Sequence, residues 1–168
     1  MRAPLAATLA LLGPALLGTS CGDAPIPTAT GAALASRTWR TLDGKLEVDL
    51  PMDLMVQPQT RAVLGTSSDG GFRFYLGVAP EPTLPEQLGA MKDELIGLGW
   101  EIEGEQHFES AVRLELARGK KPNRLWRGTW IVSGPGGVLV CEGIARDAHR
   151  MRLDDPLRAT CQAVRRLP

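Results

Sequence analysis

The strongest constraint on the fold is a series of short alternating runs separated by turn signals between residues 37 and 145. Asp43-Gly44 lies between the runs 38–41 and 45–50, and the polar segment 67–71 lies between 61–65 and 72–78. A short turn sequence between alternating runs is typical of a β-hairpin, so we expect two hairpins here. Four further runs predict an antiparallel meander: 100–107, 111–117, 125–133 and 138–145. The last of these is apolar at nearly every position, as expected of a central strand with both faces covered.

One helix is predicted between the hairpins and the meander, over residues 83–98. Its apolar residues recur at spacings of four, three, four and three: Leu84, Leu88, Met91, Leu95 and Leu98. Thr83 and Glu86 match a capping box at the start, and Gly99 suits the left-handed position after the last turn.

A second helix is predicted near the end of the chain. Asp155 is expected to cap it, with Pro156 in the first helical position. Its inner face would carry Leu157, Cys161 and Val164. Cys141 then lies on the central strand and Cys161 on the helix above it, while Gly143 lets the two approach closely.

Helices at two separate places on an antiparallel sheet predict an α+β sandwich, formed by a single domain over residues 37–168. The order of hairpins, helix, meander and helix resembles the PsbP-like fold. The local resemblance is Leu46-Glu47-Val48-Asp49-Leu50-Pro51 in the opening strand, and Cys141-Glu142-Gly143 followed by the segment 161–167. This resemblance implies an antiparallel sheet with two main helices and a role in binding or assembly. It assigns no site residue.

The amino terminus has the pattern of a secretory signal peptide over residues 1–20. Arg2 precedes an apolar run of thirteen residues, 5–17, which is too short to cross a bilayer of about 30 Å as a helix. The following Leu17-Gly18-Thr19-Ser20-Cys21 resembles a lipobox, although Gly18 stands where leucine is usual. We therefore expect lipid attachment at Cys21. The alternative is an ordinary signal peptide that is cleaved within the segment 24–35.

Residues 21–36 are rich in Pro, Ala, Thr and Gly and predict a flexible tether. Fifteen residues span at most about 50 Å when extended. The expected location is therefore the cell envelope, after secretion across the inner membrane, with the lipid holding the domain at the periplasmic or outer-membrane face.

The two remaining cysteines, Cys141 and Cys161, form an even pair. In an oxidising compartment this favours a disulfide, which would stabilise the fold by about 3 kcal/mol. The alternative is two buried free thiols.

Motifs for catalysis or cofactor binding are missing from the sequence. It has no Gly-x-Ser-x-Gly, P-loop, dinucleotide-binding or EF-hand pattern. Asp147 and His149 come nearest to a metal or base site, but without further ligands at suitable spacing. The carboxylates of Glu101, Glu103 and Glu105 are explained as one solvated strand edge. We predict a protein that is not an enzyme and has no metal and no cofactor; the alternative is a hydrolase-like enzyme with a shallow carboxylate and histidine site.

Two tryptophans, Trp126 and Trp130, share one face of a predicted strand with Gly128 between them. They could form a binding platform. We predict instead that they lie in the core, where glycine leaves space for an indole.

Charge is balanced overall, with nineteen Lys and Arg against nineteen Asp and Glu, which argues against nucleic acid as a partner. It is nevertheless uneven along the chain. Six basic residues and one acidic residue fall between 113 and 127, after a strongly acidic segment. We predict an interaction patch for anionic headgroups or an acidic protein partner, formed by Arg113, Lys120, Lys121, Arg124 and Arg127. The alternative is a solvated face whose charges are mixed by folding. Together these features predict an envelope lipoprotein that binds or assists another envelope component at the membrane surface.

Overall fold

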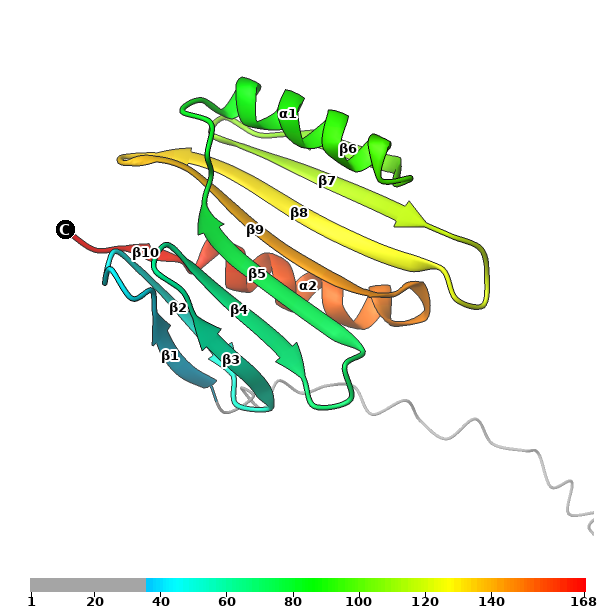
Figure 1. Cartoon of the computed structure of the whole chain (residues 1–168), viewed down its shortest axis with the longest axis horizontal. Helices are drawn as coiled ribbons and strands as arrows, with labels where there is room; N and C mark the ends of the chain where they lie inside the picture. The colour runs from blue at the N-terminus through cyan, green and yellow to red at the C-terminus, as the bar shows by residue number, and fades with distance from the viewer. Residues whose placement is uncertain (1–35) are drawn as a thin grey trace, which may run out of the picture. The chain divides into compact units, whose positions relative to one another are not determined.

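The computed structural model of the protein describes residues 36–168 (Figure 1). The predicted signal peptide, Cys21 and the predicted tether up to residue 35 lie outside the described residues. The described chain forms a larger antiparallel sheet of seven strands, a smaller sheet of three strands and two α-helices.

The larger sheet has the strand order β3-β4-β5-β9-β8-β7-β6. In that order the strands are β3 (Leu54–Pro58), β4 (Ala62–Ser67), β5 (Phe72–Val78), β9 (Gly137–Arg146), β8 (Leu125–Gly134), β7 (Ala111–Arg118) and β6 (Glu101–His107). The smaller sheet has the order β1-β2-β10, with β1 (Ser36–Arg40), β2 (Leu46–Pro51) and β10 (Arg165–Arg166). The helices are α1 (Leu84–Gly97) and α2 (Arg150–Gln162), and a 3₁₀ turn, η1 (Asp147–His149), precedes α2.

Both faces of the larger sheet are covered, so the domain has two apolar clusters. On one face α1 contributes Met91 and Leu95, which pack with Val140 of β9. On the other face, Cys141 of β9 packs with α2 and the smaller sheet. Successive residues of a strand point to opposite faces, so β9 serves both clusters from the middle of the sheet. The architecture is the predicted α+β sandwich.

The predicted hairpins, the first helix and the meander are confirmed. β1 pairs with β2 and β4 with β5, and strands β6 to β9 follow one another in antiparallel pairs. Thr83 caps α1, where its hydroxyl accepts a hydrogen bond from the backbone N–H of Glu86 at 3.4 Å. Gly99 has φ +80°, which explains why glycine follows the helix.

The predicted start of the second helix is wrong. α2 begins at Arg150, so Asp155 and Pro156 lie inside it. Pro156 has no N–H for the carbonyl four residues earlier, and the helix tolerates this loss because its first turns also pack against the sheet. Leu153, one turn before Leu157, contacts the same apolar cluster and extends the inner face toward the amino end.

Two strands were not predicted, β3 and β10. β3 is a short edge strand that ends in Pro58. Leu54 and Val56 face the core, but two alternating apolar residues are too few to mark a strand in the sequence. β10 has only two residues. The Arg165 guanidinium of β10 contacts the carboxylates of Glu47, at 2.8 Å, and Asp49, at 3.1 Å, on β2.

The central tryptophans lie in the core, as predicted. Trp126 is fully buried and Trp130 is nearly so. Close packing of α2 depends on Gly143, since a Cβ there would lie 3.0 Å from Cδ2 of Leu157.

Cys141 of β9 and Cys161 of α2 are joined in a disulfide with an S–S distance of 2.05 Å. Both residues are buried, so the bond ties the central strand to the helix above it. Among residues 36–168, no helix is both long and apolar enough to cross a membrane.

Candidate functional site

The two ends of the larger sheet present different surfaces. The β4–β5 and β7–β8 turns and the β9–α2 connection lie together at one end, because Phe72 pairs with Ala145, and Leu125 pairs with Arg146. The β2–β3 turn lies at the same end, since Leu54 pairs with Ser67 beside the β4–β5 turn. We call this the basic end; the β6–β7 and β8–β9 turns lie at the opposite end (Figure 1).

Three members of the predicted patch lie at the basic end. Lys120 and Lys121 are exposed in the β7–β8 turn. Arg124, at the end of that turn, is only partly exposed because its guanidinium contacts the carboxylates of Glu103 and Asp147, the latter at 3.6 Å. The two lysines are thus the free cations of this turn.

Arg113 and Arg127 do not extend the same exposed surface. They lie on opposite faces of the sheet, because Arg113 stands beside Trp130 and Arg127 beside Leu116. Arg113 contacts Asp154 of α2 at 2.5 Å and Glu115 at 2.6 Å. Both faces of these strands are covered and both guanidinium groups are held in ion pairs, so neither contributes to an exposed patch, contrary to the prediction.

Arg127 forms its ion pair within the sheet, with Glu142 at 2.5 Å, and its guanidinium lies 5.7 Å from the centre of the Trp100 ring. Burial raises the pKa of the Glu142 carboxyl, and the charge and hydrogen bond of Arg127 oppose that rise. Burial of the phenol raises the pKa of Tyr75, and the charge of Glu142 adds to that rise. The geometry is that of a packed ion pair between neighbouring strands.

Folding also mixes the acidic and basic segments. Arg150 of α2 contacts both Glu103 of β6, at 3.1 Å, and Glu115 of β7. Lys92 of α1 contacts Glu105 at 2.6 Å. β6 is an edge strand, as the prediction requires, but its register shifts between Ile102 and Gly104. Glu103 and Glu105 are therefore not one solvated row: each is used in an ion pair, the first with Arg150 of α2 and the second with Lys92 of α1.

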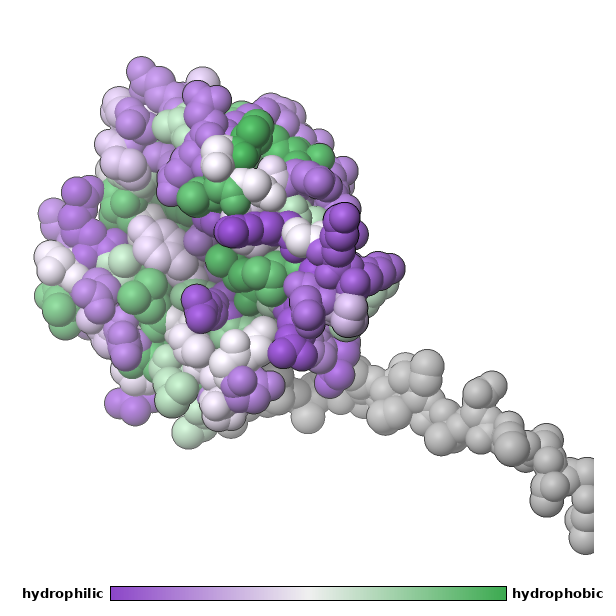
Figure 2. All heavy atoms as spheres, turned by 45° about the vertical axis from the view of Figure 1, so that its right-hand side comes forward, coloured by the Kyte–Doolittle hydropathy of each residue, from purple (hydrophilic) through white to green (hydrophobic). Residues whose placement is uncertain are grey.

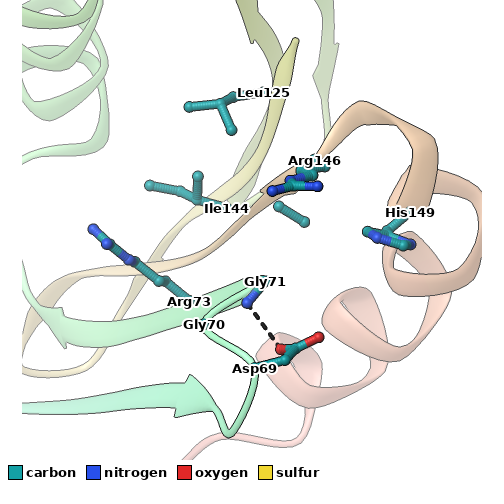
Figure 3. A pocket seen from close by; sticks show the side chains of 9 residues that line it. Asp69, Gly70, Gly71, Arg73, Leu125, Ile144, Arg146 and His149 are labelled. Carbon is teal, nitrogen blue, oxygen red and sulfur yellow. Dashed lines mark hydrogen bonds between the residues drawn. The ribbon is translucent and has the colours of Figure 1, made fainter. Parts of the chain in front are cut away.

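A hollow of about 370 Å³ opens at the basic end (Figure 3). Leu125 and Ile144 form its apolar part, while Arg73 of β5 and Arg146 at the end of β9 line it with guanidinium groups. His149 of η1 also lines it. The arrangement provides positive charge beside apolar surface.

Asp69 is the carboxylate at the rim of this hollow, and it belongs to the β4–β5 turn. It accepts a hydrogen bond from the hydroxyl of Ser67 at 2.6 Å. It accepts another from the N–H of Gly71 at 2.8 Å (Figure 3). These bonds, the Ser67 hydroxyl first, hold the pKa of Asp69 below its usual value. Asp69 therefore shapes the turn, and within residues 36–168 no cluster of three potential metal ligands forms.

A second, more apolar groove of about 470 Å³ lies at the opposite end of the domain. Phe108 of the β6–β7 turn stacks on Trp130, with ring centres 5.4 Å apart. The ring of Phe108 is half exposed (52%), although most large apolar side chains are buried. The remaining apolar lining comes from β7, β8, β9, α2 and the segment after it: Ala111, Val132, Leu139, Cys141, Cys161 and Val164.

The rim of this groove is held by Arg166 of β10. Its guanidinium donates hydrogen bonds to the carbonyl oxygens of Pro135 and Gly137 in the β8–β9 turn, the latter at 2.8 Å. Sequence reasoning missed the groove, because its lining comes from segments far apart in the chain. The one local signal was Phe108, a lone aromatic residue in a polar turn.

Comparison with known proteins identifies the fold. No family model matches the sequence, and no curated protein matches it. The solution structure of cyanobacterial PsbP from Synechocystis sp. PCC 6803 is similar over 88% of this chain and 98% of that chain, with a TM-score of 0.59 and 9% identity. A protein of unknown function from Pseudomonas aeruginosa is similar over 79% of this chain and 98% of that chain, with a TM-score of 0.51 and 10% identity. The predicted PsbP-like fold is confirmed, and at this identity the similarity concerns the fold alone.

Proposed function

We propose that this chain is a non-enzymatic binding module of the bacterial cell envelope. In this proposal a lipid on Cys21 anchors the protein, and the groove beside Phe108 holds an extended apolar segment of an envelope protein. The observation that carries the proposal is the half-exposed ring of Phe108, which stacks on Trp130 at the edge of a mostly apolar groove.

An exposed aromatic ring above apolar surface favours a binding role. Burying a whole phenylalanine side chain contributes about 1.5–3 kcal/mol, and about half of that is not realised because Phe108 is 52% exposed. A partner that covers the exposed part of the ring gains this free energy on binding. Aromatic side chains in such positions supply much of the binding free energy at protein interfaces.

A polypeptide segment suits this groove better than a small ligand. Small ligands usually occupy sites that enclose most of their surface. This groove is not enclosed, and its lining comes from the β6–β7 turn, several strands, α2 and the segment after it. Its rim offers the hydroxyl groups of Ser110 and Ser133 and the amide of Gln162, which can hydrogen-bond to a peptide backbone.

The extracytoplasmic location is supported by the Cys141–Cys161 disulfide, since such bonds persist in oxidising compartments. The signal-like run that ends at Cys21 supports the same location. The described chain begins at Ser36, which pairs with Pro51 next to the β2–β3 turn and therefore lies at the basic end. The groove lies at the other end, where an anchored domain can reach partners.

The ion pairs of the sheet support binding over catalysis. The carboxylates of Glu103, Glu105 and Glu115 each contact an arginine or a lysine. Charged groups held in this way stabilise the packing of strands and helices. A carboxylate that acts as a general acid instead needs an apolar setting that keeps it protonated near neutral pH.

Site-specific photo-crosslinking tests the proposal. A photo-reactive amino acid is placed at Ser110, on the rim of the groove, and in a matched variant at Leu42, which is exposed on the β1–β2 turn. Illumination of intact cells is expected to give a discrete protein adduct from position 110, absent from position 42. The additional change Phe108→Ser should remove the adduct. An equal yield from both positions, or no adduct from position 110, would contradict the proposal.

A further inference from the structure

We propose that the basic end of the domain binds the anionic phospholipid surface of the membrane, with Arg73 and Arg146 contacting lipid phosphates. This inference goes beyond the proposed function and does not use the groove. It concerns which side of the domain faces the bilayer and what chemistry holds it there.

The first support is an excess of free cations. Six exposed basic residues at the basic end form no ion pair within residues 36–168: Arg73, Arg118, Lys120, Lys121, Arg146 and Arg152. The acidic residues without an ion pair at this end are Asp53, Asp69 and Glu101, with Asp93 and Glu94 near the carboxyl end of α1. Asp69 is bound by the β4–β5 turn, so the free cations remain in excess. Each cation close to an anionic membrane raises the partition coefficient of a protein between water and the membrane by about fivefold.

The second support is the form of the hollow in Figure 3. Arg73 and Arg146 come from neighbouring strands, and Leu125 and Ile144 provide apolar surface beside them. A guanidinium presents a planar set of donors that fits phosphate oxygens. The adjoining apolar surface suits the glycerol and upper acyl part of a phospholipid. A freely soluble phosphate would use only the guanidinium groups.

The third support is apolar side chains exposed among these cations. Met52 in the β2–β3 turn is 66% exposed, and Met151 near the start of α2 is 89% exposed. Figure 2, which brings this side of the domain forward, shows hydrophobic patches between strongly hydrophilic side chains. Basic and apolar side chains on one surface are typical of proteins that lie in the membrane interface.

The fourth support is where the chain enters the domain. Ser36 begins β1 at the basic end, only fifteen residues after Cys21. If Cys21 carries the lipid of the proposed function, these residues keep the basic end within about 50 Å of the bilayer. At the opposite end the exposed Lys45 and Arg61 are accompanied by Asp43, Glu81 and Glu109, so that surface has no comparable excess of positive charge.

The test measures lysine acetylation of the full chain, purified from membranes and reconstituted into vesicles. One set of vesicles contains phosphatidylcholine alone, and the other contains phosphatidylcholine and phosphatidylglycerol. We expect Lys120 and Lys121 to react at least about threefold more slowly on the anionic vesicles, which corresponds to less than one cation's contribution to partitioning. Added salt should restore their reactivity, while Lys45 should react equally on both.

Two charge-reversed variants provide the matched comparison. Arg73→Glu with Arg146→Glu is expected to abolish the protection of Lys120 and Lys121. Lys45→Glu with Arg61→Glu makes the same change in net charge at the opposite end and is expected to leave it intact. Circular dichroism of both variants should match that of the unmodified chain.

Three results would overturn the inference. The first is equal acetylation of Lys120 and Lys121 on both kinds of vesicle. The second is protection that persists when Arg73 and Arg146 are both replaced by glutamate. Protection on native membranes but not on anionic vesicles would instead identify an acidic protein as the occupant. If the chain does not sediment with phosphatidylcholine vesicles, the lipid anchor is contradicted but the present inference is not. Binding to the anionic vesicles tests the basic end independently of the anchor.

Discussion

Trp126 occupies the space that a side chain at position 128 would need. A Cβ atom built on Gly128 would lie 2.6 Å from Cζ2 of the Trp126 indole, and 3.1 Å from Cδ2 of Leu157 on α2. The two residues share one face of β8, so the glycine lets the indole lie flat between the strand and the helix. The close contact between β8 and α2 thus requires a glycine at position 128.

Gly128→Ala is therefore expected to destabilise the domain. Overpacking of a close-packed core costs about 1–3 kcal/mol, and neither the buried indole nor the helix has room to move away. Urea unfolding followed by tryptophan fluorescence measures the effect. Gly89→Ala is the matched control, because a Cβ at Gly89 in α1 meets nothing within 4 Å. That control should stabilise the domain by up to about 1 kcal/mol; equal effects from both substitutions would contradict this view of the core.

The sequence correctly predicted the elements that are specified by residues close together in the chain. Asp43-Gly44 and the segment 67–71 are turn sequences between alternating runs, and both hairpins formed as expected. α1 has its capping box and an unbroken apolar stripe, and its bounds agree closely with the prediction. The core position of Trp126 follows from the tendency of large aromatic side chains to be buried, and Gly128 on the same face leaves space for the indole.

Elements that depend on distant contacts were harder to predict. The Asp155-Pro156 pair is a good local signal for a helix start, but packing of Leu153 against the core extends α2 before it. β10 consists of two arginines whose pairing with β2 involves carboxylates more than one hundred residues away. For the predicted patch, strand alternation placed Arg113 and Arg127 on the face opposite the residues next to them in the chain. It did not show that packing covers both faces of the sheet.

Loss of the disulfide is expected to destabilise the domain without changing its fold. Cys141 and Cys161 close a loop with a sequence separation of 20 residues, for which the entropy of the unfolded chain predicts about 3 kcal/mol. Urea unfolding of the Cys141→Ala, Cys161→Ala double variant measures this difference. The unmodified protein in reductant should show a similar shift of its midpoint. Alkylation of both thiols without reductant would show that the bond does not form.

The domain is expected to lose stability as the pH is lowered, in part because Glu47 becomes protonated. Hydrogen bonds from Arg40, at 2.5 Å, and Arg165, at 2.8 Å, lower the pKa of Glu47 below its usual 4.5. Since the folded state binds this proton less tightly than the unfolded state, the stabilisation is present above pH 4.5 and is lost as the pH falls through the folded pKa. Glu47→Gln should therefore lower the urea midpoint at neutral pH and have little effect in acid.

The control for Glu47 is Glu109→Gln, which changes an exposed carboxyl in the β6–β7 turn. It should leave the midpoint unchanged at both pH values. A loss of stability in Glu47→Gln that is the same at neutral and acidic pH would show that the ion pairs between β1, β2 and β10 do not cause the pH dependence.

Lipid attachment at Cys21 is a prediction about residues outside the described part of the chain. Mass spectrometry of the protein extracted from membranes should show an N-terminal Cys21 with a diacylglyceryl group. Cys21→Ser should move the protein away from the extracted lipoprotein fraction. A mature N-terminus downstream of Cys21, on a protein recovered from the soluble fraction, would exclude the anchor.

The central claim is that the groove beside Phe108 binds a protein segment, and a binding titration tests it most directly. The segment found in the Ser110 adduct is synthesised as a peptide and titrated against the unmodified chain, Phe108→Ser and Leu42→Ser. Loss of the ring should weaken binding by about 3- to 10-fold, since the peptide newly covers only its exposed half and each 1.4 kcal/mol is tenfold in affinity. Leu42→Ser, exposed outside the groove, should bind as the unmodified chain does. Equal affinity of all three proteins for the peptide would contradict the account.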